Sequence, residues 1–79
     1  MNADTRWKLA VLELDDYTCQ LPGCGANTNL DAAHIIPRRF KATRYDPANG
    51  ITLCRTHHEH FHQHPREFQS FLAEYVPHQ

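Results

Sequence analysis

Two pairs of potential metal ligands constrain this chain more than any other feature. Cys19 and Cys24 are separated by four residues, Cys54 and His57 are separated by two, and the pairs lie about 30 residues apart. Both members of each pair can reach one ion, and four such ligands complete a tetrahedron. Because thiolates combined with an imidazole favour zinc over magnesium or calcium, we predict a structural Zn²⁺ held by these four residues.

The length of the chain supports this prediction. With 79 residues and 41% hydrophobic content, it can form one domain, residues 1–79. A domain of this size buries too little apolar surface to be stable without a cross-link such as a bound metal ion. Three cysteines argue against a closed disulfide framework. In the alternative interpretation, the cysteines are small buried residues and His57 lies on a helix surface.

The sequence predicts a soluble, unexported protein without a membrane partner. Residues 1–5 contain no apolar core behind a basic end, and no stretch approaches the roughly 20 apolar residues of a membrane span. Reduced, metal-bound cysteine fits the cytoplasm, so a cytoplasmic location is expected.

The first segments predict a helix followed by a zinc knuckle. Asp4 and Thr5 can cap a helix whose apolar residues recur at i, i+3, i+4 and i+7: Trp7, Ala10, Val11 and Leu14. We assign this helix a structural role. Asp15 and Asp16 end the pattern, and residues 17–25 form a turn between two thiols.

The middle of the chain predicts a hairpin with a long loop. The segment of residues 30–36 is short, contains β-branched side chains and ends before Pro37, and these features favour a strand. Turn-forming residues fill positions 46–50, and residues 51–53 form a brief second strand.

Two helices complete the prediction. One runs from Cys54 to about His62, and Pro65 can occupy the first turn of the other. The last helix carries an apolar side that we assign to the core: Phe68, Phe71, Leu72, Tyr75 and Val76. Phe61 is assigned to the core as well. The fold class is therefore α+β.

Further polar residues converge if the hairpin packs on the helix that follows it. His34 lies near the end of the first strand, Asn49 precedes the second, and His58 and His62 have the i, i+4 spacing at which paired histidines chelate an ion. Successive helix residues diverge by about 100 degrees, so neighbouring His57 and His58 can serve two different sites. His60 and His64 point elsewhere. Taken singly, His34 could be a hydrogen-bonded core histidine, Asn49 a turn residue, and the helix pair a solvated surface.

Together these segments resemble the HNH endonuclease signature, in its cysteine-bearing branch with a structural zinc around a ββα-metal core. The resemblance covers residues from about 6 to 62 and rests on the order and spacing of several elements: residues 17–20, Cys24, residues 30–37, residues 46–54, His57, His58 and His62. It implies a small ββα-metal domain with flanking N- and C-terminal helices.

The resemblance also implies catalytic roles. His34 would be the general base that takes a proton from the attacking water. His58 and His62 would hold a divalent ion, Mg²⁺, Mn²⁺, Ni²⁺ or Zn²⁺, at the scissile phosphate, and the products would carry 5′-phosphate and 3′-hydroxyl ends. Asn49 would either bond to the loop backbone and orient the base or ligate the metal; we favour orientation, because an amide is a poor ligand beside imidazoles.

The chain departs from the family pattern at Ala33, where many relatives carry Asp or His as a further metal ligand. Asp31 would then supply the third ligand, or would instead orient a neighbouring Arg or His. A milder departure is His57, which stands where the knuckle often has cysteine, and zinc accepts either residue.

The partner predicted by the resemblance is DNA, although the formal net charge is −1. A local basic strip lies on the loop between His34 and Asn49, and we assign its side chains to phosphate contacts: Arg38, Arg39, Lys41 and Arg44. Without a recognition helix, sequence preference would be weak. Small HNH proteins of this kind occur in phages and bacteria, sometimes beside DNA-packaging enzymes, which would be a possible partner.

Two alternatives from other classes stay open. The first is a catalytically silent, zinc-stabilised DNA-binding module that keeps the fold but has lost metal affinity at Ala33. The second is a zinc-stabilised protein-interaction domain, which would be favoured if the loop arginines proved irrelevant to DNA retention.

Overall fold

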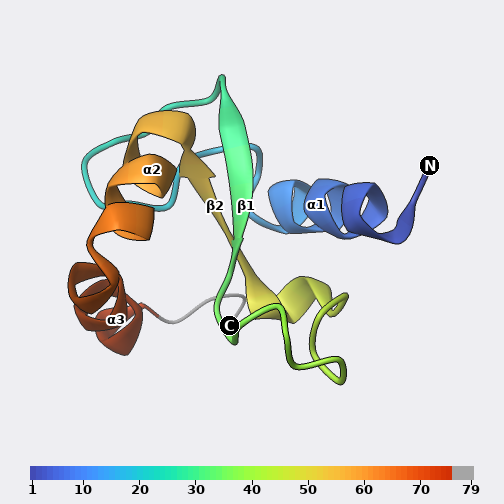
Figure 1. Ribbon diagram of the computed structural model, residues 1–79. Coiled ribbons are helices and arrows are strands. Elements are labelled where there is room, and N and C mark those ends of the chain that lie inside the picture. Colours follow the sequence, from blue (N-terminus) through green and yellow to red (C-terminus); the bar gives the residue numbers. More distant parts are fainter. Residues whose placement is uncertain (76–79) are drawn as a thin grey trace.

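The computed structural model describes residues 1–75 as a two-stranded sheet with helices on both faces (Figure 1). In chain order the elements are α1 (Ala3–Leu14), β1 (Leu30–His34), the 3-10 helix η1 (Pro47–Asn49), β2 (Gly50–Cys54), α2 (Arg55–Gln63) and α3 (Pro65–Glu74). The expected α+β, ββα arrangement with flanking helices is confirmed. Val76, predicted to extend the apolar side of the last helix, lies outside the described residues.

The strands β1 and β2 form an antiparallel hairpin that runs from the Leu30–Cys54 pair to the His34–Gly50 pair. Residues 35–49 connect them, so the predicted long loop is confirmed. In Figure 1, α1 lies on one side of this hairpin and α2 with α3 on the other, as the helix–strand contacts also indicate. The hairpin is therefore the central layer of the domain.

Alternate residues of the hairpin face opposite helices, as the two-residue period of a strand requires. Ala33, Ile51 and Leu53 pack into one hydrophobic cluster with Phe61 of α2. Phe68 and Phe71 of α3, and Tyr75 directly after it, cover this cluster from outside and are partly buried. The predicted assignment of these aromatic side chains to the core is confirmed.

The structure corrects two details of α1. Its N-cap is Asn2, whose side-chain oxygen accepts a hydrogen bond from the Thr5 backbone N–H at 2.8 Å, and not Asp4 or Thr5. The buried residues of the helix are Trp7, Val11 and Leu12, whereas the side chain of Leu14 is 53% exposed.

The carboxylate of Asp15 connects the end of α1 to the sheet by a hydrogen bond. It is buried, and its Oδ2 accepts a hydrogen bond from the Thr52 backbone N–H at 2.8 Å. The hydroxyl of Tyr75 lies 3.5 Å from Oδ1. Burial, together with the negative charge of Asp15 and this contact, raises the pKa of Tyr75 to about 12. The residue that ends the first helix thus also fixes its packing on β2.

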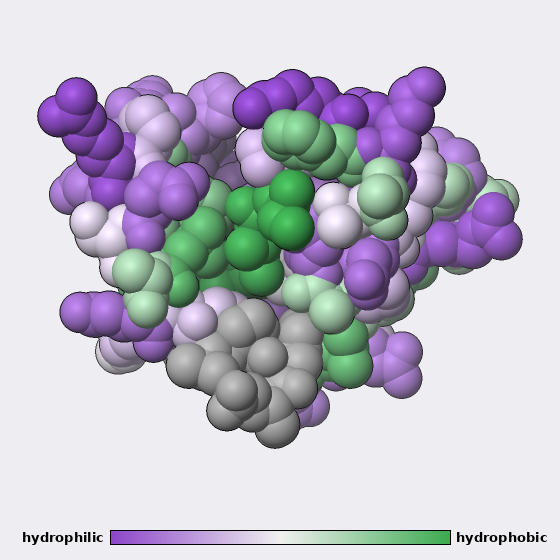
Figure 2. Space-filling view, turned by 90° about the horizontal axis from the view of Figure 1, so that it is seen from below, coloured by the Kyte–Doolittle hydropathy of each residue, from purple (hydrophilic) through white to green (hydrophobic). Residues whose placement is uncertain are grey.

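Apolar surface remains exposed on this small domain. Figure 2 shows hydrophobic side chains gathered at the centre of the face seen from below, with hydrophilic side chains around them. On the connection between the strands, Ile36, Phe40 and Tyr45 are each more than two-fifths exposed. Such exposure is expected where a chain is too short to cover all its apolar groups. Within residues 1–75, no helix is long and apolar enough to cross a membrane.

Gly50 is required by close packing rather than by turn geometry. Its φ of −142° is ordinary extended backbone, but a β-carbon there would collide with Val11 and come within 2.9 Å of the Trp7 ring. We expect Gly50→Ala to lower the free energy of unfolding by about 1–3 kcal/mol, because α1 must move away from the sheet. Urea unfolding at a fixed zinc concentration measures this change, and an unaltered midpoint would contradict it.

Candidate active site and metal centre

The four predicted zinc ligands converge beside the first turn of α2. The Nδ1 atom of His57 lies 3.1 Å from the Cys54 sulfur and 3.8 Å from the Cys19 sulfur, and the sulfurs of Cys24 and Cys54 are 3.9 Å apart. All four ligand atoms lie within 4.8 Å of one another. The prediction that these residues form one cluster able to hold a metal is confirmed.

The cluster has the dimensions of a tetrahedral zinc site. Zinc–sulfur bonds of about 2.3 Å place two ligand sulfurs about 3.8 Å apart, and zinc–nitrogen bonds of about 2.0–2.1 Å place nitrogen and sulfur about 3.6 Å apart. The cysteines form no disulfide. Three thiols and one imidazole therefore fit a structural zinc ion in both geometry and ligand chemistry.

The thiols of the cluster differ in their readiness to ionise. Burial raises the pKa of Cys19, although backbone hydrogen bonds oppose this effect. A hydrogen bond from the backbone of Ala26 lowers the pKa of Cys24 despite some desolvation. Because a metal binds the thiolate, these opposite pKa shifts favour the metal-binding form of Cys24 over that of Cys19.

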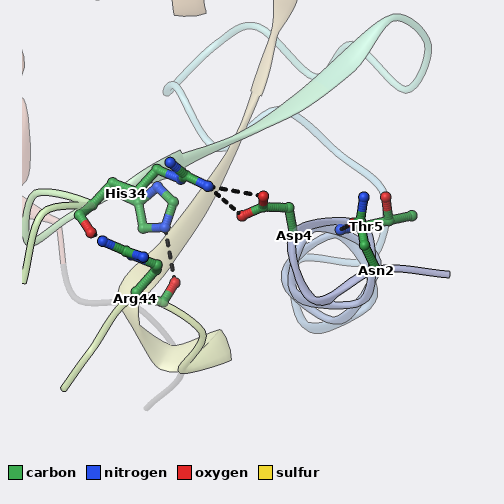
Figure 3. Close-up of polar contacts among 6 residues, drawn as sticks. Asn2, Asp4, Thr5, His34 and Arg44 are labelled. Carbon is green, nitrogen blue, oxygen red and sulfur yellow. Dashed lines mark hydrogen bonds and ion pairs between the residues drawn. The ribbon is translucent and has the colours of Figure 1, made fainter. Parts of the chain in front are cut away.

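The imidazole of His34 is fixed by a hydrogen bond to the loop. Its Nε2 lies 2.9 Å from the backbone oxygen of Arg44 (Figure 3). A carbonyl oxygen only accepts, so Nε2 carries the hydrogen of the neutral ring and Nδ1 carries the lone pair. The loop therefore selects the tautomer in which Nδ1 can accept a proton.

Trp7 is a site residue that the sequence analysis did not identify. Its ring stacks on that of His34 with centroids 3.9 Å apart and an angle of 6° between the planes. The indole N–H donates a hydrogen bond to the backbone oxygen of Asp46 at 2.8 Å. Trp7 had been assigned to a purely structural apolar stripe, and nothing in the spacing of that stripe indicates contact with a histidine 27 positions later.

Asn49 uses its whole amide group to hold the loop. The side-chain oxygen accepts from the Ile36 backbone N–H at 2.6 Å, and the side-chain nitrogen donates to the backbone oxygens of Ile36 and Thr43, both at 3.1 Å. The residue is buried. These bonds tie both ends of the loop together close to Arg44, whose carbonyl orients His34.

Two of the histidines of α2, His58 and His62, share a hollow with His34. His34, His58 and His62 line one hollow of about 270 Å³, and His34 and His58 also line an adjacent one of about 510 Å³ that includes Asp31. Among residues 1–75, however, Asp31, His58 and His62 do not form a trio with ligand atoms within 4.8 Å of one another. The side chains surround a common space without a closed ligand set.

Asp31 contacts positively charged or protonatable partners. One oxygen lies 3.2 Å from His58 Nδ1, and the other lies 3.5 Å from the Arg55 guanidinium and 3.8 Å from Lys8 Nζ. Desolvation acts to raise the pKa of Asp31, but the hydrogen bonds and charges of His58 and Arg55 outweigh it and lower that pKa. The contact with His58 Nδ1 leaves Nε2 of that ring free to face an ion.

The loop arginines are partly engaged within the protein. Arg38 forms two hydrogen bonds of 2.8 and 2.9 Å with the carboxylate of Asp4 (Figure 3). The guanidinium of Arg44 donates to the Arg38 backbone oxygen at 2.7 Å. Arg39 lies over the ring of Phe40 and is exposed, as is Lys41. The strip thus presents Arg39 and Lys41 to solvent more freely than Arg38.

Comparison with known proteins identifies the family. A model of the HNH endonuclease family matches residues 19–65, which is more than half of the chain. The chain therefore belongs to the HNH endonuclease family, and HNH nucleases act on DNA. No curated protein and no solved structure gave a match. The matched segment contains the cysteine–histidine cluster, the hairpin and α2, but not α1 with Trp7.

Removing the metal should unfold the domain. We expect Cys24→Ser to lower the thermal midpoint strongly and chelators to do the same to the unaltered chain, because a structural zinc contributes directly to the stability of such small domains. Circular dichroism with and without chelator measures both effects. Thr18→Ser, close to the knuckle but outside the cluster, is the control. A chelator-resistant fold would contradict a structural role for the metal.

Proposed function

We propose that the protein is a metal-dependent endonuclease that hydrolyses DNA phosphodiester bonds by nicking or double-strand cleavage, with weak sequence preference. The observation that carries the proposal is the position of His34: its tautomer is set by Arg44, and its ring lines the same hollow as His58 and His62. A proton acceptor and a pair of ion ligands facing one space are the parts that hydrolysis of a phosphodiester requires.

In this proposal His34 is the general base. Its Nδ1 accepts a proton from the attacking water, and the Arg44 carbonyl bonded to Nε2–H stabilises the positive ring that results. The Trp7 ring stacked beside it adds cation–π stabilisation to that charged state. The His34 ring need not reorient during the reaction, because its contacts with the Arg44 carbonyl and the Trp7 ring exist beforehand.

Asn49 acts through the loop. Its three hydrogen bonds to Ile36 and Thr43 hold the backbone that carries the Arg44 carbonyl, which in turn holds His34. Each polar atom of the amide already has a backbone partner, which supports orientation over metal ligation. We therefore propose Asn49 as a positioning residue.

His58 and His62 would hold the catalytic ion. When bound, the ion supplies charge stabilisation for the scissile phosphate and the leaving 3′ oxygen. His58 Nδ1 bonds to the Asp31 carboxylate, which leaves Nε2 as the ligand atom. Ligating histidines commonly donate the second ring N–H to a carboxylate in this way. We therefore assign Asp31 to the orientation of His58 rather than to a third ligand position.

Imidazole ligands suit Zn²⁺ or Ni²⁺ better than Mg²⁺ or Mn²⁺, which prefer oxygen ligands. With two protein ligands, the ion would keep several coordination positions for water and phosphate oxygens. The proposed structural zinc cluster is separate, since its imidazole is that of His57 and its other ligands are sulfurs.

DNA contact is assigned to the loop. Arg39 and Lys41 would meet backbone phosphates directly, and Arg38 and Arg44 would do so from the same strip. Because Arg38 is paired with Asp4, its contribution requires exchange of that ion pair for a phosphate. The reduced thiols of the cluster favour the cytoplasm as the place of action.

The alternative is a catalytically silent, zinc-stabilised DNA-binding module. Ala33 favours it, because that side chain cannot bind an ion at the position next to the proposed base. This alternative predicts DNA retention without cleavage, which separates it from the enzyme.

Plasmid cleavage tests the proposal. Zinc-loaded protein with added Mn²⁺, Ni²⁺ or Mg²⁺ should convert supercoiled plasmid to nicked or linear DNA, and mild chelation that spares the structural zinc should stop it. We expect His34→Ala to lower the rate by roughly 10²–10⁴-fold through loss of the base. Thr56→Ala, an exposed change on α2, is the control.

No cleavage with any of these metals, from folded and zinc-loaded protein, would refute the nuclease proposal. Retention of plasmid on the same protein would then support the silent DNA-binding module, and its absence would favour a protein-interaction domain.

Trp7 supports a second test within this proposal. We expect Trp7→Leu to lower kcat about tenfold or more while KM changes little, because the His34 ring loses the surface that orients it. Trp7→Phe keeps an aromatic face but not the hydrogen bond to Asp46. Its kcat should therefore lie between those of the unaltered chain and Trp7→Leu. An unchanged kcat in folded Trp7→Leu would show that the stack does not position the base.

A further inference from the structure

A second group of metal-ligating side chains lies where α2 meets α3. His60 Nε2 lies 2.7 Å from one oxygen of Glu67, and His64 Nδ1 lies 3.6 Å from the same oxygen. The two imidazole rings have centroids 4.4 Å apart. The three ligand atoms lie within 4.8 Å of one another, and all three side chains are exposed.

The turn between the helices explains why these residues meet. His60 and His64 are one helical turn apart, and the His64 backbone N–H still bonds to the His60 carbonyl at 2.9 Å. His64 then leaves the helical conformation, and Pro65 begins α3. Glu67 lies in the first turn of α3, so the change of direction returns its carboxylate to the two rings.

This group is separate from the proposed catalytic pair. Residues 58 and 60 differ by about 200 degrees around a helix, so the two i, i+4 histidine pairs of α2 point to nearly opposite sides. His58 and His62 line the hollow with His34, whereas His60, His64 and Glu67 make no contribution to that hollow. Neither the structural cluster nor the catalytic proposal uses this second pair.

We propose that His60, His64 and Glu67 form a surface site for a divalent transition-metal ion, of the Zn²⁺, Co²⁺, Ni²⁺ or Cu²⁺ class. Two imidazoles and a carboxylate are ligands that these ions favour, while Mg²⁺ and Ca²⁺ require more oxygen ligands than the group offers. The exposed side chains can rotate by the small amount needed to bring all three atoms into one coordination sphere. A fourth position stays open to water.

The ion would join α2 to α3. His60 comes from one helix and Glu67 from the other, so a shared ion cross-links them at the turn. Pro65 and Phe68 of α3 line the hollow that contains His34, His58 and His62. Occupancy of the surface site therefore fixes one wall of that hollow without placing an ion inside it.

The test is a titration of zinc-loaded protein with further Zn²⁺, followed by NMR of the imidazole nitrogens. We expect the ring signals of His60 and His64 to shift to those of metal-bound imidazole. Glu67→Gln should weaken this response at least about tenfold by removing one of three ligands. Glu74→Gln, an acidic residue at the far end of α3, is the matched control and should behave as the unaltered chain does.

Failure of this site and failure of the nuclease proposal give different results. In His58→Ala, which disables the proposed catalytic pair, the His60 and His64 response should persist. Ring signals of His60 and His64 that stay unchanged at millimolar Zn²⁺, or an equal response in Glu67→Gln and Glu74→Gln, would overturn the surface site. Neither result depends on DNA cleavage.

Discussion

The arrangement of this domain depends on the convergence of two short segments on one cluster of sulfur and nitrogen atoms. The knuckle carries Cys19 and Cys24, while Cys54 and His57 lie at the junction of β2 and α2. Joining these segments fixes the direction in which α2 leaves the sheet. The hydrophobic cluster alone is small, so a metal ion held at this point would contribute stability that packing of so short a chain cannot supply.

The hairpin separates two kinds of environment. Its α2 face is an apolar cluster around Ile51 and Leu53, and its α1 face holds His34 against Trp7. His34 ends β1, where the strand gives way to the loop, so its imidazole can be buried on one side by Trp7 and remain open toward the α2 histidines on the other. The position at the strand end thus leaves a firmly held side chain accessible to solvent.

Much of this organisation follows from the sequence. The spacing of the three cysteines and His57 indicated the cluster, because both members of each pair can reach one ion at these intervals. A chain too short for a large core also needs such a cross-link. β-Branched residues bounded by Pro37 and turn formers indicated the two strands, and helical periodicity indicated the first and last helices. The order and spacing of the cysteines, His34, Asn49 and the helix histidines indicated the HNH endonuclease family, and the family model that matches residues 19–65 confirms this.

Only the tertiary structure decided contacts between residues far apart in the chain. The stack of Trp7 on His34 and the pairing of Arg38 with Asp4 follow from how α1 lies across the hairpin. The partners of Asp31 were open in the sequence, and in the structure they are His58, Arg55 and Lys8. Periodicity reports which face of an element is apolar, but it does not report what that face meets. The physical reason is that such contacts depend on the relative placement of elements, which is set by packing and cross-links rather than by local preference.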